Sequence, residues 1–332
     1  MRIGENPNNH KKLNFKNTGH RVIIPVYIPN NEGYFKESLA VFKICIESLI
    51  ATINKDTAIS IISNGSSNEV NLFIAALLDN GKINRAIFNS ENVGKVNAIM
   101  AETRASFEEF ITYSDSDVFF DKGWLKQTFD MFNNIPKAGF VSMNPIINNF
   151  SSSKSTLLAN IPTLLFKRKK VSDVCGYKDL QHFHKSIGQA KSYTERIFNT
   201  ETFCVGGTNN YIIGAGHFCC TIRKTPTLKF VPTTRFFGAF KGAEEHYLDT
   251  PFDKTGLWKL SSPKAFVWHM GNSVEEDWTQ KKMEALNDFF EEDFSFSTLS
   301  FKNVTITSII FPYKMKSAFV RLLKLFKILK SF

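Results

Sequence analysis

The fold of this chain can be predicted outward from one stretch, Phe110-Ile111-Thr112-Tyr113-Ser114-Asp115-Ser116-Asp117-Val118-Phe119-Phe120. Its apolar and β-branched residues favour a buried strand. The Ser-Asp-Ser-Asp segment ends that strand, because these short polar side chains hydrogen-bond to the local backbone. Ligands of open α/β sheets bind at the carboxyl ends of the strands. We therefore expect the carboxylates of Asp115 and Asp117 to face a ligand, where they can hold a divalent cation that neutralises a diphosphate.

Strand-like and helical segments alternate before this stretch. Strands are expected at 21–29, 58–63 and 85–89, and helices at 35–53, 68–78 and 96–107. This alternation predicts an α/β fold with a mostly parallel central sheet and flanking helices. Right-handed crossovers place the strand ends, and the polar loops that follow them, on one edge of the sheet.

The whole chain is predicted to divide into four parts. Residues 1–19 are rich in Asn and Lys and are expected to be flexible. Residues 20–147 and 148–275 are predicted to be two halves of one domain, and residues 276–332 a helical extension. The segment 148–200 carries Ser-rich and Lys-rich runs, and we expect it to shape one side of the site.

Two later segments carry groups that suit catalysis or metal binding. Glu244 and Glu245 follow a Gly-punctuated segment at a predicted helix start, where a negative side chain is stabilised. One of them can deprotonate a hydroxyl, although a surface carboxylate pair at a helix start is the structural alternative. His269 ends a predicted strand and can complete the coordination of a cation, or it can simply be packed and hydrogen-bonded.

Charge and cysteine content exclude several classes of protein. The formal charge is +10, and six of the cations lie without an acid in the last nineteen residues, so +4 is left for the rest. No basic face for nucleic acid is therefore expected. Five cysteines without a CxxC spacing indicate reduced thiols, not a disulfide framework or a zinc site. No apolar segment suits a signal peptide or a membrane span, which favours a cytoplasmic protein.

The last twenty residues have the pattern of a basic amphipathic helix. Bulky apolar residues fall on one side and Lys324 and Lys327 on the other: Phe319, Leu322, Leu325, Phe326 and Leu329. Such a helix binds an anionic membrane interface, which predicts a peripheral protein on the inner face of the cell membrane. Docking of residues 313–332 on the protein's own core is the alternative.

In this order the segments resemble the GT-A-fold glycosyltransferases, most closely the family-2 group of mostly inverting bacterial enzymes. The matching motifs are Ile24-Pro25-Val26-Tyr27, Ser63-Asn64-Gly65-Ser66, Asn92-Val93-Gly94-Lys95, Asp115-Ser116-Asp117, Glu244-Glu245 and His269-Met270-Gly271. Two positions depart from the family pattern, because Asn64 stands for a base-contacting Asp and Glu245 for the Asp of the usual Glu-Asp pair.

The resemblance implies a metal-dependent transfer of a hexosyl or N-acetylhexosaminyl group from a UDP-sugar. The acceptor would be a hydroxyl of a lipid-linked glycan in bacterial polysaccharide, O-antigen or capsule-type biosynthesis. Asp117, His269 and Asp115 would hold Mn²⁺ or Mg²⁺, with Asp115 also near the ribose. Glu245, with Glu244 as the alternative, would be the general base. The nucleotide would be bound by Pro25, Tyr27, Asn64, Asn92, Lys95, Asp115 and Ser116.

Two other functions remain open at this point. A sugar-1-phosphate nucleotidyltransferase shares a related sheet, but it needs a Gly-rich basic loop after the first strand, where this chain has Pro29-Asn30-Asn31-Glu32-Gly33. A catalytically silent, membrane-associated module that binds glycans or nucleotide sugars would not need Asp117, Glu245 and His269 together.

Overall fold

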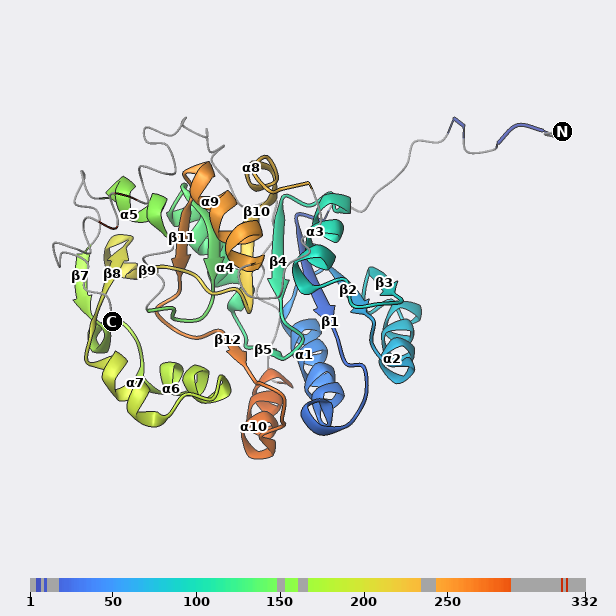
Figure 1. Ribbon diagram of the computed structural model, residues 1–332, viewed down its shortest axis with the longest axis horizontal. Coiled ribbons are helices and arrows are strands. Elements are labelled where there is room, and N and C mark those ends of the chain that lie inside the picture. The colour runs from blue at the N-terminus through green and yellow to red at the C-terminus, as the bar shows by residue number, and fades with distance from the viewer. Residues whose placement is uncertain are drawn as a thin grey trace.

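A computed structural model describes residues 4–6, 9–10, 18–147, 153–160, 167–233 and 243–287, with the single positions 318 and 321. The expected membrane-binding helix 313–332 and most of the expected flexible segment 1–19 lie outside the described residues. Within them, helices cover both faces of one large central sheet (Figure 1).

The central sheet contains ten of the described strands, and it begins with the predicted parallel unit. The strands are β1 His20–Val26, β2 Thr57–Asn64, β3 Arg85–Asn89, β4 Phe110–Ser114, β6 Ala138–Ser142, β7 Lys167–Lys170, β8 Glu201–Val205, β9 Tyr211–Ile213, β10 Cys219–Arg223 and β11 Trp258–Ser261. Their spatial order is β3-β2-β1-β4-β10-β6-β11-β9-β8-β7. Strands β3, β2, β1 and β4 run parallel, and β10 is the first antiparallel neighbour.

The second half of the sheet mixes both directions. Strand β11 is parallel to β6, whereas β9 is antiparallel to both β11 and β8. The short connection between β8 and β9 explains the last pairing, because parallel strands need a long crossover. Strand β10 lies between β4 and β6, so the two predicted halves share one continuous sheet.

The helices of the two faces pack on separate apolar cores. Their bounds are α1 Ser38–Thr52, α2 Asn68–Asp79, α3 Lys95–Ala105, α4 Trp124–Asn134, α5 Lys154–Asn160, α6 Tyr177–Ser186, α7 Lys191–Phe198, α8 Lys224–Leu228, α9 Thr250–Thr255 and α10 Glu276–Asn287. Val22 and Ile24 of β1 point to the core with α1, α2 and α4, and Ile23 points to the core with α3 and α9. A central parallel strand is buried on both faces, which is why residues 22–26 of β1 are apolar, whereas His20 and Arg21 at its start are buried with polar partners.

A short second sheet lies beside the large one. Strand β5, Val118–Phe120, pairs antiparallel with β12, Val267–His269. Helix α10 covers this pair, since the rings of Trp278 and Phe119 meet edge-on with centroids 5.4 Å apart. The small sheet therefore brings the segment that follows β4 next to a segment about 150 residues later in the chain.

A buried ion pair anchors the first strand at the opposite end from its polar loop. The Arg21 guanidinium donates to both carboxylate oxygens of Glu108, through Nε at 2.9 Å and Nη2 at 2.7 Å. Both residues are buried. This fork-on-fork contact ties β1 to the loop before β4.

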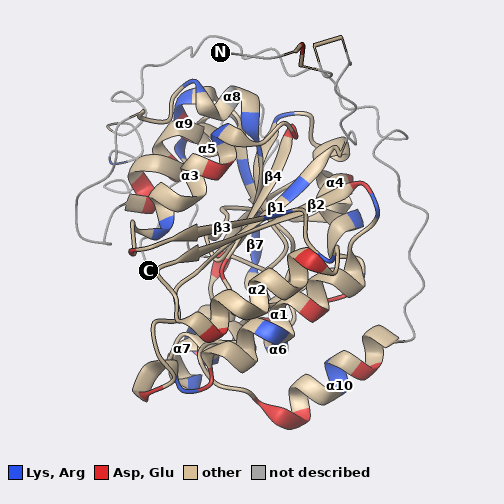
Figure 2. Cartoon of the chain, turned by 90° about the vertical axis from the view of Figure 1, so that its right-hand side faces the viewer, with Lys and Arg blue, Asp and Glu red and all other residues tan. Residues whose placement is uncertain are grey.

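Charged side chains on the outer helices are mixed in sign. Figure 2 shows Lys and Arg interspersed with Asp and Glu on α1, α2, α6, α7 and α10, without a continuous basic stripe on that face of the described chain. No helix among the described residues combines the length and the apolar character that crossing a membrane requires.

Candidate active site

The Asp115–Asp117 segment connects β4 to β5 at the carboxyl edge of the sheet. Its backbone is fixed at both ends, because Asp115 N donates to Phe218 O at 2.7 Å and Met270 N donates to Asp117 O at 2.8 Å. In the β5–β12 ladder His269 is the register partner of Val118. The structure thus brings His269 beside the carboxylate pair, with its Nε2 3.4 Å from Asp117 Oδ2.

Asp115, Asp117 and His269 form a ligand set that fits a divalent cation. One ligand atom from each lies within 4.8 Å of the others. Asp117 Oδ1 is buried and has no hydrogen-bond partner among the described residues, and burial raises the pKa of the Asp117 carboxyl to about 6. Buried polar atoms are normally paired. Two carboxylates with an imidazole suit Mn²⁺, and this orphaned oxygen is an atom that such an ion would satisfy.

The orientation of His269 is set by a residue that the sequence did not single out. Ser186 Oγ, at the end of α6, donates its one proton to Phe183 O at 2.8 Å. At 3.0 Å from His269 Nδ1 it therefore accepts a hydrogen bond from that nitrogen. In the neutral imidazole the lone pair is then on Nε2, which faces Asp117. Metal-binding histidines are oriented in this way by a partner on the other nitrogen.

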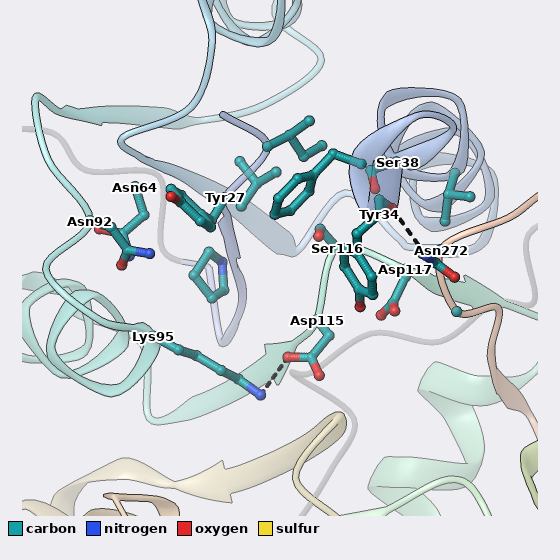
Figure 3. A pocket seen from close by; sticks show the side chains of 16 residues that line it. Tyr27, Tyr34, Ser38, Asn64, Asn92, Lys95, Asp115, Ser116, Asp117 and Asn272 are labelled. Carbon is teal, nitrogen blue, oxygen red and sulfur yellow. Dashed lines mark hydrogen bonds and ion pairs between the residues drawn. The ribbon is translucent and has the colours of Figure 1, made fainter. Parts of the chain in front are cut away.

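A cavity of about 320 Å³ opens on one side of this ligand set (Figure 3). All seven predicted nucleotide-binding residues line it: Pro25, Tyr27, Asn64, Asn92, Lys95, Asp115 and Ser116. The cavity also includes residues that the sequence prediction missed, among them Tyr34, whose carbonyl accepts a hydrogen bond from Asn272 Nδ2 at 3.0 Å. Asn272 follows His269 by three residues, so the imidazole and this wall of the cavity belong to one segment.

The amide of Asn64 is held by the last residue of β3 and by the loop that follows this strand. Its Oδ1 accepts from Val93 N and from Asn89 Nδ2, both at 3.1 Å. Its Nδ2 donates to Asn92 Oδ1 at 2.8 Å. Because a backbone N–H fixes the oxygen, the amide orientation is determined. An aspartate here would set a carboxylate against Asn92 Oδ1, which gives a physical reason for the amide.

Gly65 allows these two loops to approach. Its φ is +81°, and a Cβ there would lie 2.8 Å from the backbone nitrogen of Asn92. A side chain would therefore meet rigid backbone as well as an unfavourable conformation.

Lys95 lies between the nucleotide cavity and a second cavity. Its Nζ is 2.5 Å from Asp115 Oδ1 and 2.9 Å from Glu244 Oε1. Burial alone would lower the pKa of Lys95, but the charges of Asp115 and Glu244 outweigh it and raise the pKa. Lys95 is therefore a fixed positive charge that joins the aspartate pair to the late glutamate.

The second cavity, of about 460 Å³, places Glu244 and not Glu245 at the site. Glu244 lines it together with Lys95, Asp115 and His269, and its outer wall comes from α6, α7 and residues 145–147. Glu245 is exposed and lines neither this cavity nor the first. Successive residues of a helical turn point in different directions, so the turn that begins here can aim only one of the pair inward. Of the two predicted candidates for the general base, Glu244 lines the cavity and Glu245 does not, and the role of either remains a prediction.

An α/β sheet with a carboxylate pair and an imidazole at its carboxyl edge, between two cavities, is the arrangement expected of a nucleotide-sugar transferase of the GT-A class. The chain belongs to glycosyl transferase family 2, because the model of that family matches residues 22–204, more than half of the 332 residues. The predicted family and fold class are confirmed. This assignment also separates the chain from the nucleotidyltransferases.

Solved structures with similar folds are remote in sequence. TarS 1–349 of S. aureus has 12% identity and a TM-score of 0.45, covering 76% of this chain and 60% of that one. A mannosyltransferase from Pyrobaculum calidifontis, in complex with GDP-Man and Mn²⁺, has 12% identity, a TM-score of 0.45 and coverages of 82% and 66%. This chain thus spans less than two thirds of either protein's length. No curated protein matches the sequence.

Proposed function

We propose that this chain transfers a hexosyl or N-acetylhexosaminyl group from a UDP-sugar to a hydroxyl group, with inversion and with Mn²⁺ or Mg²⁺. The observation that carries the proposal is the meeting of Asp115, Asp117 and His269 at the boundary of two cavities. The first cavity would take the nucleotide and the second the acceptor. A cation bound by the three residues would supply Lewis-acid stabilisation of the leaving diphosphate.

The residues of the chain divide the remaining work. The exposed ring of Tyr27 offers a face on which a base can stack, and Asn92 offers its amide N–H groups. Glu244 would accept the proton of the acceptor hydroxyl while that oxygen bonds to the anomeric carbon. In the same step the bond from the anomeric carbon to the diphosphate oxygen breaks, and the electron pair leaves with UDP. Glu245 remains the other candidate for the proton acceptor.

The acceptor and the location belong to the same proposal. A lipid-linked glycan would reach the second cavity if the basic residues 313–332 bind the inner face of the membrane, as in bacterial polysaccharide, O-antigen or capsule-type assembly. Sedimentation with anionic liposomes, with and without residues 313–332, tests this. Equal recovery of both proteins in the pellet would contradict a membrane-binding tail.

The donor assignment is tested with a panel of nucleotide sugars and Mn²⁺. Calorimetric titration and release of the nucleotide should both select a UDP-sugar, and Asp117→Asn should abolish both. Asp130→Asn is the matched control, because Asp130 pairs with Lys126 on α4 and lines neither cavity. Undiminished Mn²⁺-dependent turnover in Asp117→Asn would refute the metal role, and binding without any turnover would favour a silent binding module.

A further inference from the structure

A partly buried imidazole at the second cavity lies between two carboxylates. His217 Nδ1 is 3.3 Å from Glu244 Oε2, and His217 Nε2 is 3.1 Å from Asp249 Oδ2. The ring stacks on the fully buried Phe140, with centroids 6.0 Å apart and planes inclined by 22°. Its side chain is 20% exposed. His217 lies in the bend between β9 and β10, two residues before β10 begins.

The two carboxylates are each tied to a lysine as well. Asp249 Oδ1 accepts from Lys259 Nζ at 2.5 Å, and Lys259 is fully buried. Glu244 Oε1 accepts from Lys95 Nζ at 2.9 Å. Positive and negative groups therefore alternate from the metal-ligand end of the site into the core: Asp115, Lys95, Glu244, His217, Asp249 and Lys259. Asp253, whose carboxyl is also close to Lys259, is the other acid on this side.

Only the charged form of His217 is attracted to both carboxylates. Both contacts are ion pairs by their distances, and His217 Nε2 has no hydrogen-bond partner of regular geometry among the described residues, so Asp249 is attracted by the charge of an imidazolium. Burial alone would lower the pKa of His217, but the neighbouring carboxylates of Asp249 and Glu244 outweigh it and raise the pKa to about 9. In turn the interaction with His217 makes the largest contribution to a Glu244 pKa of about 2.

We propose that His217 is a positioning residue: as an imidazolium shared by Asp249 and Glu244, it fixes the Glu244 carboxylate at the second cavity. This bridge connects the Glu244 side chain to the protein core, because Asp249 and Lys259 are buried. The role in transfer rests on the proposed function, in which Glu244 takes the acceptor's proton. Neither a sequence motif nor the carboxylate pair itself indicates this residue.

The charged bridge is tested without any substrate, by ¹⁵N NMR of the full chain labelled at histidine. His217→Gln identifies the resonance. In the wild-type protein it should stay doubly protonated through pH 8 and titrate near 9, and Glu244→Gln should shift that titration to lower pH. His246→Gln is the control, because His246 is exposed two residues beyond Glu244. Titration of His217 near its ordinary value of 6.5 would overturn the proposal.

The positioning role is tested by separating turnover from donor binding. Glutamine keeps a neutral N–H donor group but cannot carry the positive charge, so His217→Gln should fold, bind UDP and Mn²⁺ with unchanged affinity, and lose up to about 100-fold in kcat for UDP-sugar turnover. The fall of wild-type activity as pH rises through about 9 should be absent from the variant. Wild-type kcat in His217→Gln would overturn the role. A wild-type protein that binds no nucleotide sugar would instead refute the proposed function, and the NMR titration would still decide the bridge.

Discussion

Replacing Glu108 by Gln should destabilise the protein in a way that depends on pH. Burial would raise the pKa of Glu108, but the hydrogen bonds from Arg21 and Thr18 outweigh it and lower the pKa from 4.5 to about 2. At 1.36 kcal/mol per pKa unit this difference corresponds to about 3 kcal/mol. The carboxylate is buried, so solvent does not screen the pair strongly. Glu108→Gln keeps the shape of the side chain and leaves the buried Arg21 without its bidentate partner.

The sign of the pH dependence follows from the lowered pKa. The contribution of Glu108 is fully present above pH 4.5 and is lost as pH falls through about 2. The wild-type protein should therefore exceed the variant by about 3 kcal/mol at pH 7 and by about 1.5 kcal/mol at pH 3. Urea unfolding at both pH values measures the difference, with Glu109→Gln as the control, because Glu109 is the exposed neighbour. A gap that stays constant between pH 7 and pH 3 would refute the reasoning.

Three further changes test the site. Ser186→Ala removes the hydrogen-bond partner of His269 and should weaken Mn²⁺ about 10- to 100-fold in calorimetric titrations with UDP; unchanged affinity would contradict its orienting role. Gly65→Ala should abolish UDP binding in the same titration, because the new methyl group meets the Asn92 backbone at 2.8 Å. Glu244→Gln should stop release of UDP from a UDP-sugar while leaving UDP affinity intact, and equal loss in Glu245→Gln alone would reverse the assignment of the base.

The parallel half of the fold could be predicted because its sequence signals are local. Strand β1 is apolar from residue 22 to residue 26, and β4 is followed at once by the Asp115-Ser116-Asp117 segment. The helices between these strands are separated from them by polar turn residues. The predicted helix at 35–53 begins three residues later as α1, after a short 3-10 turn at Gly33–Phe35. The seven residues that the family resemblance implies for nucleotide binding line one cavity, because polar loops after parallel strands share one edge.

The features of the site that the sequence could not predict are contacts between side chains that lie far apart in the chain. The two strands that flank His217 belong to one sheet, but its partners Glu244 and Asp249 come from a turn about thirty residues later. Ser186 lies in the segment 148–200, whose Lys- and Ser-rich composition indicates no role in orienting a ligand. Which of Glu244 and Glu245 lines the second cavity is set by the direction of one helical turn, and a pair of identical neighbouring residues does not reveal that direction.

The two-stranded sheet has a consequence for the motion of the site. His269 is carried by three residues of β12 that pair with β5 outside the ten-stranded sheet. This ladder has only three residue pairs, and α10 and the main core cover it. We expect it to open more readily than the central strands of the ten-stranded sheet, because fewer backbone hydrogen bonds must break. Deuterium should then enter the amides of 267–269 sooner than those of 22–24, and a bound nucleotide with its ion should slow that exchange by closing the ladder. On the proposed function, a nucleotide held by His269 and its ion would then leave more readily when these three residue pairs are open.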